Sequence, residues 1–180
     1  LQCCGRAVGL EEGQMGGSEV GHLNMGAGRV VFQDLTKINN SIEDGSFFEN
    51  KVLLDAINHI KLTGGKLHIM GLLSDGGIHS KTSHLKALVD LAQKHNVKNI
   101  CIHAFTDGRD TLKDSGINFV KQTEAYLPSN ARICTVMGRF YAMDREQRYD
   151  RTQKAYDALV LGRADNYFQS AQEYLKQSYS

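Results

Sequence analysis

Residues 66–161 alternate between short apolar runs and longer amphipathic segments, and this alternation constrains the fold more than any other feature of the sequence. The apolar runs predict strands at residues 66–73, 97–105 and 131–137. The helical spacing of apolar residues predicts helices at residues 80–95, 116–126 and 148–161. Strands that alternate with helices of this length form βαβ units with right-handed crossovers. We therefore predict an α/β fold, with a parallel sheet that carries helices on both faces.

The segments outside this region carry weaker signals. Residues 1–28 are rich in glycine and are expected to form a short irregular segment, because they could not form a core alone. Helices are predicted at residues 34–44 and 49–62, and residues 162–180 are expected to add one more helix. The sequence begins with Leu1 rather than methionine, and no strand follows the last predicted helix. Both observations lead us to expect a piece of a longer chain.

Two of the apolar runs, Leu67–Met70 and Ile100–Phe105, suit strands that are buried on both faces. His68 and His103 lie inside these runs and are expected to be hydrogen-bonded core residues. Neither they nor the other histidines have the spacing of metal ligands. We therefore assign no chemistry to this group.

The four cysteines match neither a disulfide framework nor the spacing of a zinc site. Two are adjacent near the start of the chain, Cys3 and Cys4, and the other two lie inside apolar runs. We expect Cys101 and Cys134 to be buried small hydrophobes in a reducing compartment, the cytoplasm.

Charge is balanced along the chain, with 21 basic and 20 acidic residues and a formal net charge of +1. This balance gives no electrostatic case for a nucleic acid or an anionic membrane as partner. No apolar stretch reaches the roughly 18 residues of a membrane span. Any affinity for anions must therefore come from local clusters of residues.

Ionisable residues beside glycines follow each of the three predicted strands. The segments are Asp75-Gly-Gly-Ile-His79, Asp107-Gly-Arg-Asp110 and Gly138 to Arg145. Because ligands of parallel sheets bind at the carboxyl ends of the strands, the three segments predict a shared site. Ordinary solvent-exposed loops remain the alternative.

Each candidate in these segments has a functional and a structural interpretation. The Arg109 guanidinium matches a phosphate or carboxylate, and Asp110 could accept or return a hydroxyl proton. Alternatively, the two form an ion pair that stabilises the loop. His79 could be a solvated loop residue or a helix cap, and a salt-bridged surface turn would explain Arg139 and Arg145.

A second candidate feature is the glycine-rich segment Gly13-Gln-Met-Gly-Gly-Ser-Glu-Val-Gly-His22. Its four glycines allow positive φ and close approach of a ligand, and backbone N–H groups in such turns bind anions. Ser18 is the hydroxyl at its centre. The composition is compatible with a plain glycine-rich loop or with a serine that handles phosphate.

Four motifs, in the same order, resemble the cofactor-independent phosphoglycerate mutases of the alkaline phosphatase superfamily. They are the segment Gly13–His22 followed by Leu23-Asn-Met-Gly-Ala-Gly-Arg-Val-Val, then Gly71-Leu-Leu-Ser-Asp-Gly-Gly-Ile-His79, His103-Ala-Phe-Thr-Asp-Gly-Arg-Asp-Thr111, and Gly138-Arg-Phe-Tyr-Ala-Met-Asp-Arg145. The resemblance extends from about residue 8 to about residue 160.

The resemblance implies an isomerase that interconverts 3-phosphoglycerate and 2-phosphoglycerate in glycolysis and gluconeogenesis, through a phosphoserine at Ser18. It implies Asp110 as acid or base, and substrate contacts from His79, Arg109, Asp110, Arg139 and Arg145. Two divalent metal ions, typically manganese, would be cofactors, with Ser18 as one ligand and the remaining ligands outside this chain. A full-length monomer is implied.

The resemblance also implies two domains. Residues 1–32 correspond to a fragment of a phosphatase-like metal-binding domain with the nucleophile loop and linker. Residues 33–180 correspond to most of a transferase domain that binds substrate, truncated at its C-terminal end, where a further pair of arginines is expected.

Two departures from the family pattern bear on activity. Gly17 replaces an asparagine before the serine, and Leu112 and Lys113 replace a pair of prolines. Since parts of the family's site are also absent, we expect no mutase turnover from this chain alone. The alternatives are a non-catalytic remnant that binds anions and a related metal-dependent phosphatase, which would not need three loops with arginine and histidine.

Overall fold

The computed structural model describes residues 2–180. The chain divides into two compact units, one ending at Leu54 and the other spanning Asp55–Ser180, and each is described by itself. This division is one of compactness within the chain. The expected domain boundary after residue 32 stays a prediction.

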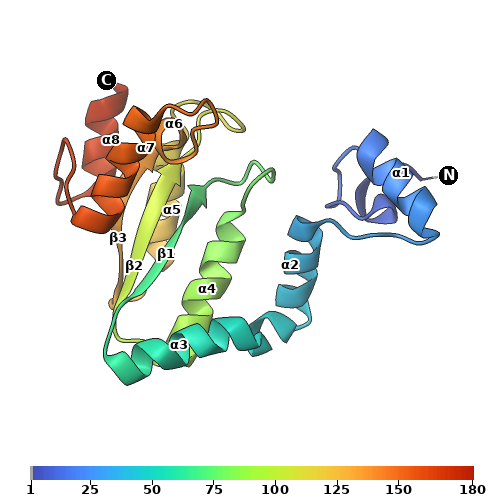
Figure 1. The fold of residues 1–180 in the computed structure, drawn as a ribbon, viewed down its shortest axis with the longest axis horizontal. Coiled ribbons are helices and arrows are strands. Elements are labelled where there is room, and N and C mark those ends of the chain that lie inside the picture. The colour runs from blue at the N-terminus through green and yellow to red at the C-terminus, as the bar shows by residue number, and fades with distance from the viewer. Residues whose placement is uncertain (1) are drawn as a thin grey trace. The chain divides into compact units, whose positions relative to one another are not determined.

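The second unit is built on a three-stranded parallel sheet in the order β1-β2-β3 (Figure 1). The strands are β1 Leu67–Leu73, β2 Ile100–Thr106 and β3 Ala131–Gly138. All three lie within about three residues of the predicted runs, and the parallel pairing confirms the α/β prediction. All three strands end at the same edge, which is the upper edge in Figure 1.

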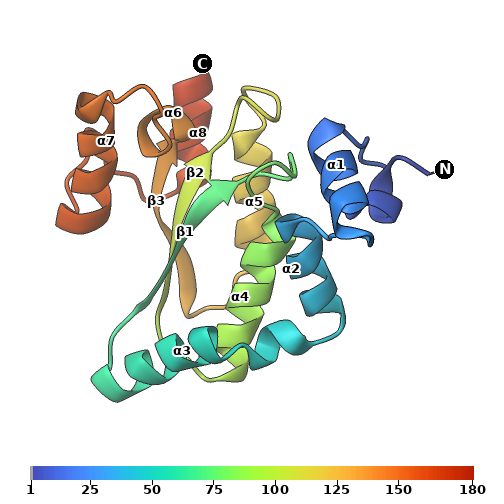
Figure 2. The ribbon, with the colours of Figure 1, turned by 45° about the vertical axis from the view of Figure 1, so that its right-hand side comes forward.

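Helices lie on both sides of this sheet, as predicted; Figure 2 shows α4 and α5 on one side and α7 on the other. The helices are α3 Lys51–Thr63, which begins in the first unit, α4 Thr82–Lys94, α5 Gly116–Tyr126, α6 Arg139–Ala142, α7 Tyr149–Tyr156 and α8 Ala171–Tyr179. The helix predicted over residues 148–161 changes at Asp157 into a π-helix, Asp157–Leu161, which Gly162 ends in the left-handed conformation.

One hydrophobic cluster of the core lies between the sheet and helices α5 and α8. Its buried members are Leu73, Ala104, Val120, Ala171 and Leu175. Burial of a Val or Leu side chain contributes roughly 1.5–3 kcal/mol, so these contacts hold α8 on the sheet. The expectation of a helix in residues 162–180 is therefore confirmed.

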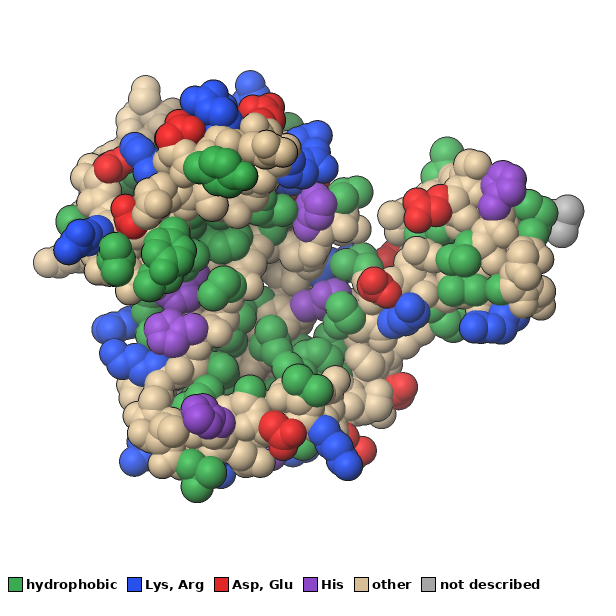
Figure 3. All heavy atoms as spheres, viewed as in Figure 1, with side chains coloured by type: hydrophobic (Ala, Val, Ile, Leu, Met, Phe, Trp, Pro, Cys, Tyr) green, Lys and Arg blue, Asp and Glu red, His purple; other side chains and the backbone are tan. Residues whose placement is uncertain are grey.

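The two faces of β1 differ in burial, which corrects one prediction. Residues 100–104 are buried, as expected for a central strand, but Met70 is 59% exposed and His68 is also exposed. Within the described residues β1 pairs only with β2, so it is an edge strand with one packed face. Figure 3 shows histidine and hydrophobic side chains at the surface along β1.

His103 and His68 accordingly have different environments. The buried His103 ring lies 2.9 Å from Thr135 Oγ1 and 2.8 Å from His68 Nδ1, so its prediction as a hydrogen-bonded core residue is confirmed. His68 shares the contact but is exposed, so its assignment to the core is wrong.

The first unit is more regular than its glycines suggest. Its elements are the 3-10 helix η1 Gly5–Val8, α1 Ser18–Ala27, α2 Asp34–Glu43 and the 3-10 helix η2 Ser46–Glu49. Asn24 holds it together, because its amide donates to the Val8 carbonyl oxygen at 2.9 Å and accepts from the Val31 N–H at 2.7 Å. The prediction that residues 1–28 are irregular is therefore wrong for α1. Across residues 2–180, no helix is long and apolar enough to cross a membrane.

Candidate active site

Side chains from the ends of all three strands meet at the carboxyl edge of the sheet. We call Ser74, His79, Asp107, Asp110 and Arg139 the strand-end cluster. Figure 3 shows acidic and basic side chains gathered at this end of the second unit. The predicted meeting of the three loops is thus found for His79, Asp110 and Arg139.

Asp107 is the hydrogen-bonding centre of the cluster, and its side chain is only 1% exposed. Its carboxylate accepts hydrogen bonds from the Ser74 hydroxyl at 2.6 Å and from the N–H groups of Arg109 and Asp110, both at 3.0 Å. Burial alone would raise the pKa of Asp107, but these bonds and the bond from Arg139 hold it well below the usual range. Asp107 is therefore a carboxylate that shapes the loop.

Arg139 links the second and third strand ends. Its Nη1 donates to Asp107 Oδ1 at 2.8 Å and to Asp110 Oδ2 at 2.6 Å, and its side chain is 12% exposed. Partial burial opposes its charge, yet the two carboxylates raise the pKa of the guanidinium above its usual range. Arg139 is therefore salt-bridged, as the structural alternative expected, but the pairs are largely buried rather than at the surface.

The first strand end contributes His79, whose Nε2 lies 3.9 Å from Asp110 Oδ2. Gly76 allows this loop to approach, because a Cβ atom there would stand 2.9 Å from the Asp110 Cβ. The Gly76 N–H also donates to the Ser74 hydroxyl at 3.1 Å. Gly76 is thus required by packing, whereas its neighbour Gly77 has a positive φ of 70°.

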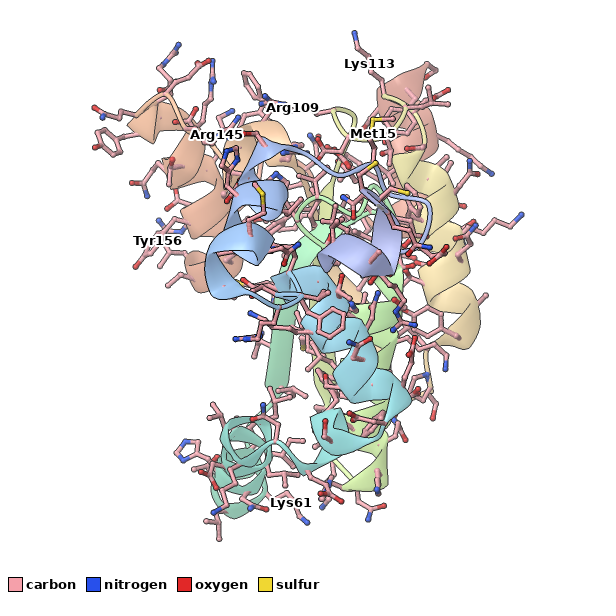
Figure 4. All side chains as sticks on the ribbon, turned by 90° about the vertical axis from the view of Figure 1, so that its right-hand side faces the viewer. Met15, Lys61, Arg109, Lys113, Arg145 and Tyr156 are labelled. Carbon is pink, nitrogen blue, oxygen red and sulfur yellow. The ribbon has the colours of Figure 1, made fainter. Side chains whose placement is uncertain are left out.

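Arg109 and Arg145 differ from Arg139. Both are exposed, and within residues 2–180 neither side chain has a hydrogen-bond or ion-pair partner. Figure 4 labels both at the end of the unit where the strands terminate. The alternative of an Arg109–Asp110 ion pair is wrong, since Arg139 is the partner of Asp110.

A separate ion pair shapes the loop that carries Arg145. Asp144, 3% exposed, accepts from Arg151 Nη1 at 3.1 Å and from the N–H groups of Glu146 and Arg148. Burial opposes ionisation of Asp144, but the backbone donors and Arg151 lower its pKa below the usual range. Asp144 thus stabilises this loop by pairing with Arg151, and it does not pair with Arg145.

Asp107 and Ser74 were missed by the sequence analysis as members of the site. Asp107 stood in a quoted motif but received no role, because a structural carboxylate and a catalytic one look alike in sequence. Asp107 does lie two residues before Arg109 and directly after a buried strand. An aspartate at such a position commonly caps the following turn, and this pattern could have indicated the role of Asp107.

In the first unit, Ser18 opens helix α1 and is exposed. The helix N-terminus places unpaired backbone N–H groups near its hydroxyl, an arrangement that favours anions. Of the neighbouring glycines, Gly13 has a positive φ of 75°, whereas Gly17 is extended at −153°. Gly16 is required for another reason, since a Cβ there would stand 2.1 Å from the Cys3 carbonyl oxygen.

His22 lies one helical turn after Ser18 but is poorly placed to take its proton. Its Nδ1 is 2.7 Å from the Ser18 carbonyl oxygen and 3.2 Å from the Ser18 hydroxyl. The shorter contact favours a proton on Nδ1 that is donated to the carbonyl. That tautomer leaves Nδ1 no lone pair for the hydroxyl.

The metal ions implied by the resemblance were tested against these side chains. Among residues 2–180, no group of three or more His, Cys, Asp or Glu side chains is arranged to hold a metal ion. Ser18 offers one hydroxyl, with His22 as its hydrogen-bonding neighbour. The residues present do not by themselves fit a divalent ion.

A known protein family matches most of the chain. The family model described as "BPG-independent PGAM N-terminus" matches residues 38–180, a range that includes the whole strand-end cluster. The chain belongs to this family. Cofactor-independent phosphoglycerate mutases are thus its relatives in sequence.

Individual relatives extend the match to the N-terminal residues. The 2,3-bisphosphoglycerate-independent phosphoglycerate mutase 2 of Methanosarcina acetivorans is 57% identical over 164 residues, which are 90% of this chain and 32% of that one. The mutase of Akkermansia muciniphila is 52% identical over 181 residues, covering 100% of this chain and 35% of that one. The chain spans about a third of the length of these curated relatives.

A solved structure is similar in fold. The Leishmania mexicana phosphoglycerate mutase, crystallised at low cobalt concentration, matches 98% of this chain and 34% of its own with a TM-score of 0.85 and 34% identity. The α/β architecture is therefore that of about a third of this phosphoglycerate mutase structure.

Proposed function

We propose that this chain is the substrate-binding part of a phosphoglycerate mutase that interconverts 3-phosphoglycerate and 2-phosphoglycerate. The observation that carries the proposal is the strand-end cluster beside two unpaired arginines. A phosphoglycerate has two anionic groups, a carboxylate and a phosphate, and exposed guanidinium groups can bind both in a bidentate manner. Family membership supports the same assignment.

Within this proposal, Arg109 and Arg145 bind the anionic groups, and Arg139 fixes Asp110. Arg139 contacts one carboxylate oxygen of Asp110, so Oδ1 stays available to take the proton of a substrate hydroxyl. His79, 39% exposed, lies beside this carboxylate and can donate to the substrate. In this proposal, substrate binding and proton transfer are carried out by different side chains at the carboxyl edge of the sheet.

We further propose that Ser18 carries the phosphoryl group between the two hydroxyls of the glycerate. Phosphoryl transfer depends mostly on positioning and charge stabilisation, and the N-terminus of α1 supplies N–H donors for a phosphate on Ser18. Two divalent ions, manganese, with Ser18 as one ligand, a cytoplasmic location and a monomeric full-length enzyme complete the proposal.

A chimera tests the proposal. These 180 residues would replace the matching third of the Akkermansia muciniphila relative, and conversion of 3-phosphoglycerate would be measured with manganese present. We expect turnover and a phosphoserine at Ser18, both lost in the Ser18→Ala chimera, and no turnover from the 180 residues alone. A folded chimera without turnover would support the non-catalytic remnant instead. Release of inorganic phosphate without 2-phosphoglycerate would support a phosphatase.

A further inference from the structure

A hollow of about 150 Å³ lies at the edge of the sheet where the strands begin, opposite the strand-end cluster. This is the lower edge of the sheet in Figure 1. Residues at or just before the starts of all three strands line the hollow. The polar ones among them are Lys66, Asn99, Ser129, Asn130 and Arg132.

The charge around this hollow is of one sign. Lys66 and Arg132 are both exposed, and within residues 2–180 neither side chain has a hydrogen-bond or ion-pair partner. Among the described residues that line the hollow, none is acidic. Two cations that share one small concavity without a counter-charge attract an anion.

The turn before β3 adds neutral hydrogen-bond donors to the two cations. The Ala131 N–H donates to the Pro128 carbonyl oxygen at 2.9 Å, which closes a turn with Ser129 and Asn130 at its centre. The Ser129 hydroxyl and the N–H groups of these two central residues have no partner within the part of the chain that the structure describes. Backbone N–H groups of such turns commonly bind anions.

Asn130 holds this turn in place without any ligand. Its side-chain oxygen accepts from Gln93 Nε2 at 2.5 Å, and its Nδ2 donates to the Val97 carbonyl oxygen at 2.6 Å. Its backbone carbonyl oxygen accepts from the Ile100 N–H at 2.9 Å. These bonds tie the turn to α4 and to the start of β2. The wall of the hollow is therefore preformed, and a ligand loses less affinity to ordering it.

We propose that this hollow is a second anion site, which binds one phosphate group, either free or as a phosphate monoester. The Arg132 guanidinium matches two phosphate oxygens, and the Lys66 ammonium supplies a compact positive charge. The Ser129 hydroxyl donates to a further oxygen. Pockets for whole small molecules measure about 300–1,000 Å³, so this hollow suits a single phosphate group with the rest of an ester in solvent. The mutase proposal uses none of these residues.

An NMR titration of the 180-residue chain with inorganic phosphate tests the proposal. We expect the backbone amides of residues 99–101 and 129–132 to shift together, with one dissociation constant in the millimolar range. Sodium chloride at the same ionic strength should not reproduce these shifts. A second titration with glycerol 2-phosphate separates the two sources of the group. Saturable shifts with both compounds would assign the site to phosphate monoesters as well, and shifts with inorganic phosphate alone would assign it to the free ion.

Two variants and one control assign the binding to the hollow. Arg132→Gln and Lys66→Gln should each weaken the binding of phosphate about tenfold or more, since each removes a charge-assisted hydrogen bond. Lys98→Gln is the control, because Lys98 is exposed at the same edge of the sheet but does not line the hollow. It makes the same change in net charge and should leave binding unchanged.

Arg109→Gln separates this site from the proposed substrate site. It should weaken only the shifts of residues 107–110 and leave those of residues 129–132 unchanged. The absence of saturable shifts at residues 129–132, or equal weakening by Lys98→Gln and Arg132→Gln, would overturn the proposal. Because the titration of the parent chain needs no substitution, a variant that fails to fold does not prevent the test.

Discussion

The carboxyl edge of the sheet has a buried half and an exposed half, which differ in whether their charged side chains are paired. In the buried half, Asp107, Asp110 and Arg139 satisfy one another through ion pairs of 2.6–2.8 Å. In the exposed half, Arg109 and Arg145 have no partner within residues 2–180. From this difference we infer that the buried half sets the shape of the loops, while the unpaired arginines of the exposed half bind the ligand.

The largest expected effect comes from the buried half. Asp107→Asn keeps the shape but removes the charge that faces Arg139, and breaking a buried ion pair costs about 3–5 kcal/mol. Urea unfolding followed by circular dichroism measures the loss. Asp165→Asn is the matched control, because its pair with Lys154 is exposed and should contribute at most about 1 kcal/mol. Equal losses in both variants would remove the distinction between the halves.

The exposed half should show the opposite pattern. Arg109→Gln and Arg145→Gln should each weaken 3-phosphoglycerate binding by about ten- to a hundredfold, since a charge-assisted hydrogen bond contributes roughly 1.5–3 kcal/mol. Their unfolding free energies should stay within about 0.5 kcal/mol of the parent. Isothermal titration calorimetry measures the binding.

Lys61→Gln is the control for charge in these titrations. It makes the same change in net charge at the other end of the unit, as Figure 4 shows, and should leave binding unchanged. If it weakened binding as much as Arg109→Gln, the attraction would be a property of the whole surface rather than of the site.

The same contrast of burial occurs in the histidine pair of β1 and β2. Burial, and then the neighbouring His68, lower the pKa of His103 in the folded chain. The unfolded chain therefore binds the proton more readily, and stability should fall as pH drops through about 6.5. We expect a lower urea midpoint at about pH 5.5 than at about pH 7.5. His103→Asn should reduce this difference more than His68→Asn, and an equal reduction would contradict the assignment to burial.

The smallest effect is expected in the serine segment. Gly17 is extended and has no atom within 4 Å of a Cβ position, so Gly17→Asn should change stability by no more than about 1 kcal/mol, in the favourable direction. Gly16→Asn, whose Cβ would collide with the Cys3 carbonyl oxygen, should destabilise the same unit. Thermal unfolding of the two variants side by side checks this.

The sequence was informative where one physical pattern dominated. Alternating apolar runs and helices predicted the parallel sheet, and the rule for strand ends predicted that His79, Asp110 and Arg139 would meet. It failed for β1, because burial on both faces depends on neighbours that a run of apolar residues does not reveal. It also failed to pair Asp110 with Arg139, since 29 residues separate them and only the fold decides which arginine approaches.

The measurement that tests the central claim most directly is an NMR titration of the 180-residue chain with 3-phosphoglycerate. The account predicts that backbone amides of residues 76–79, 107–110 and 138–145 shift together with one dissociation constant, and that Arg109→Gln weakens all three sets. Shifts confined to one loop, or none at a concentration that saturates binding in calorimetry, would contradict a shared anion site at the carboxyl edge of the sheet.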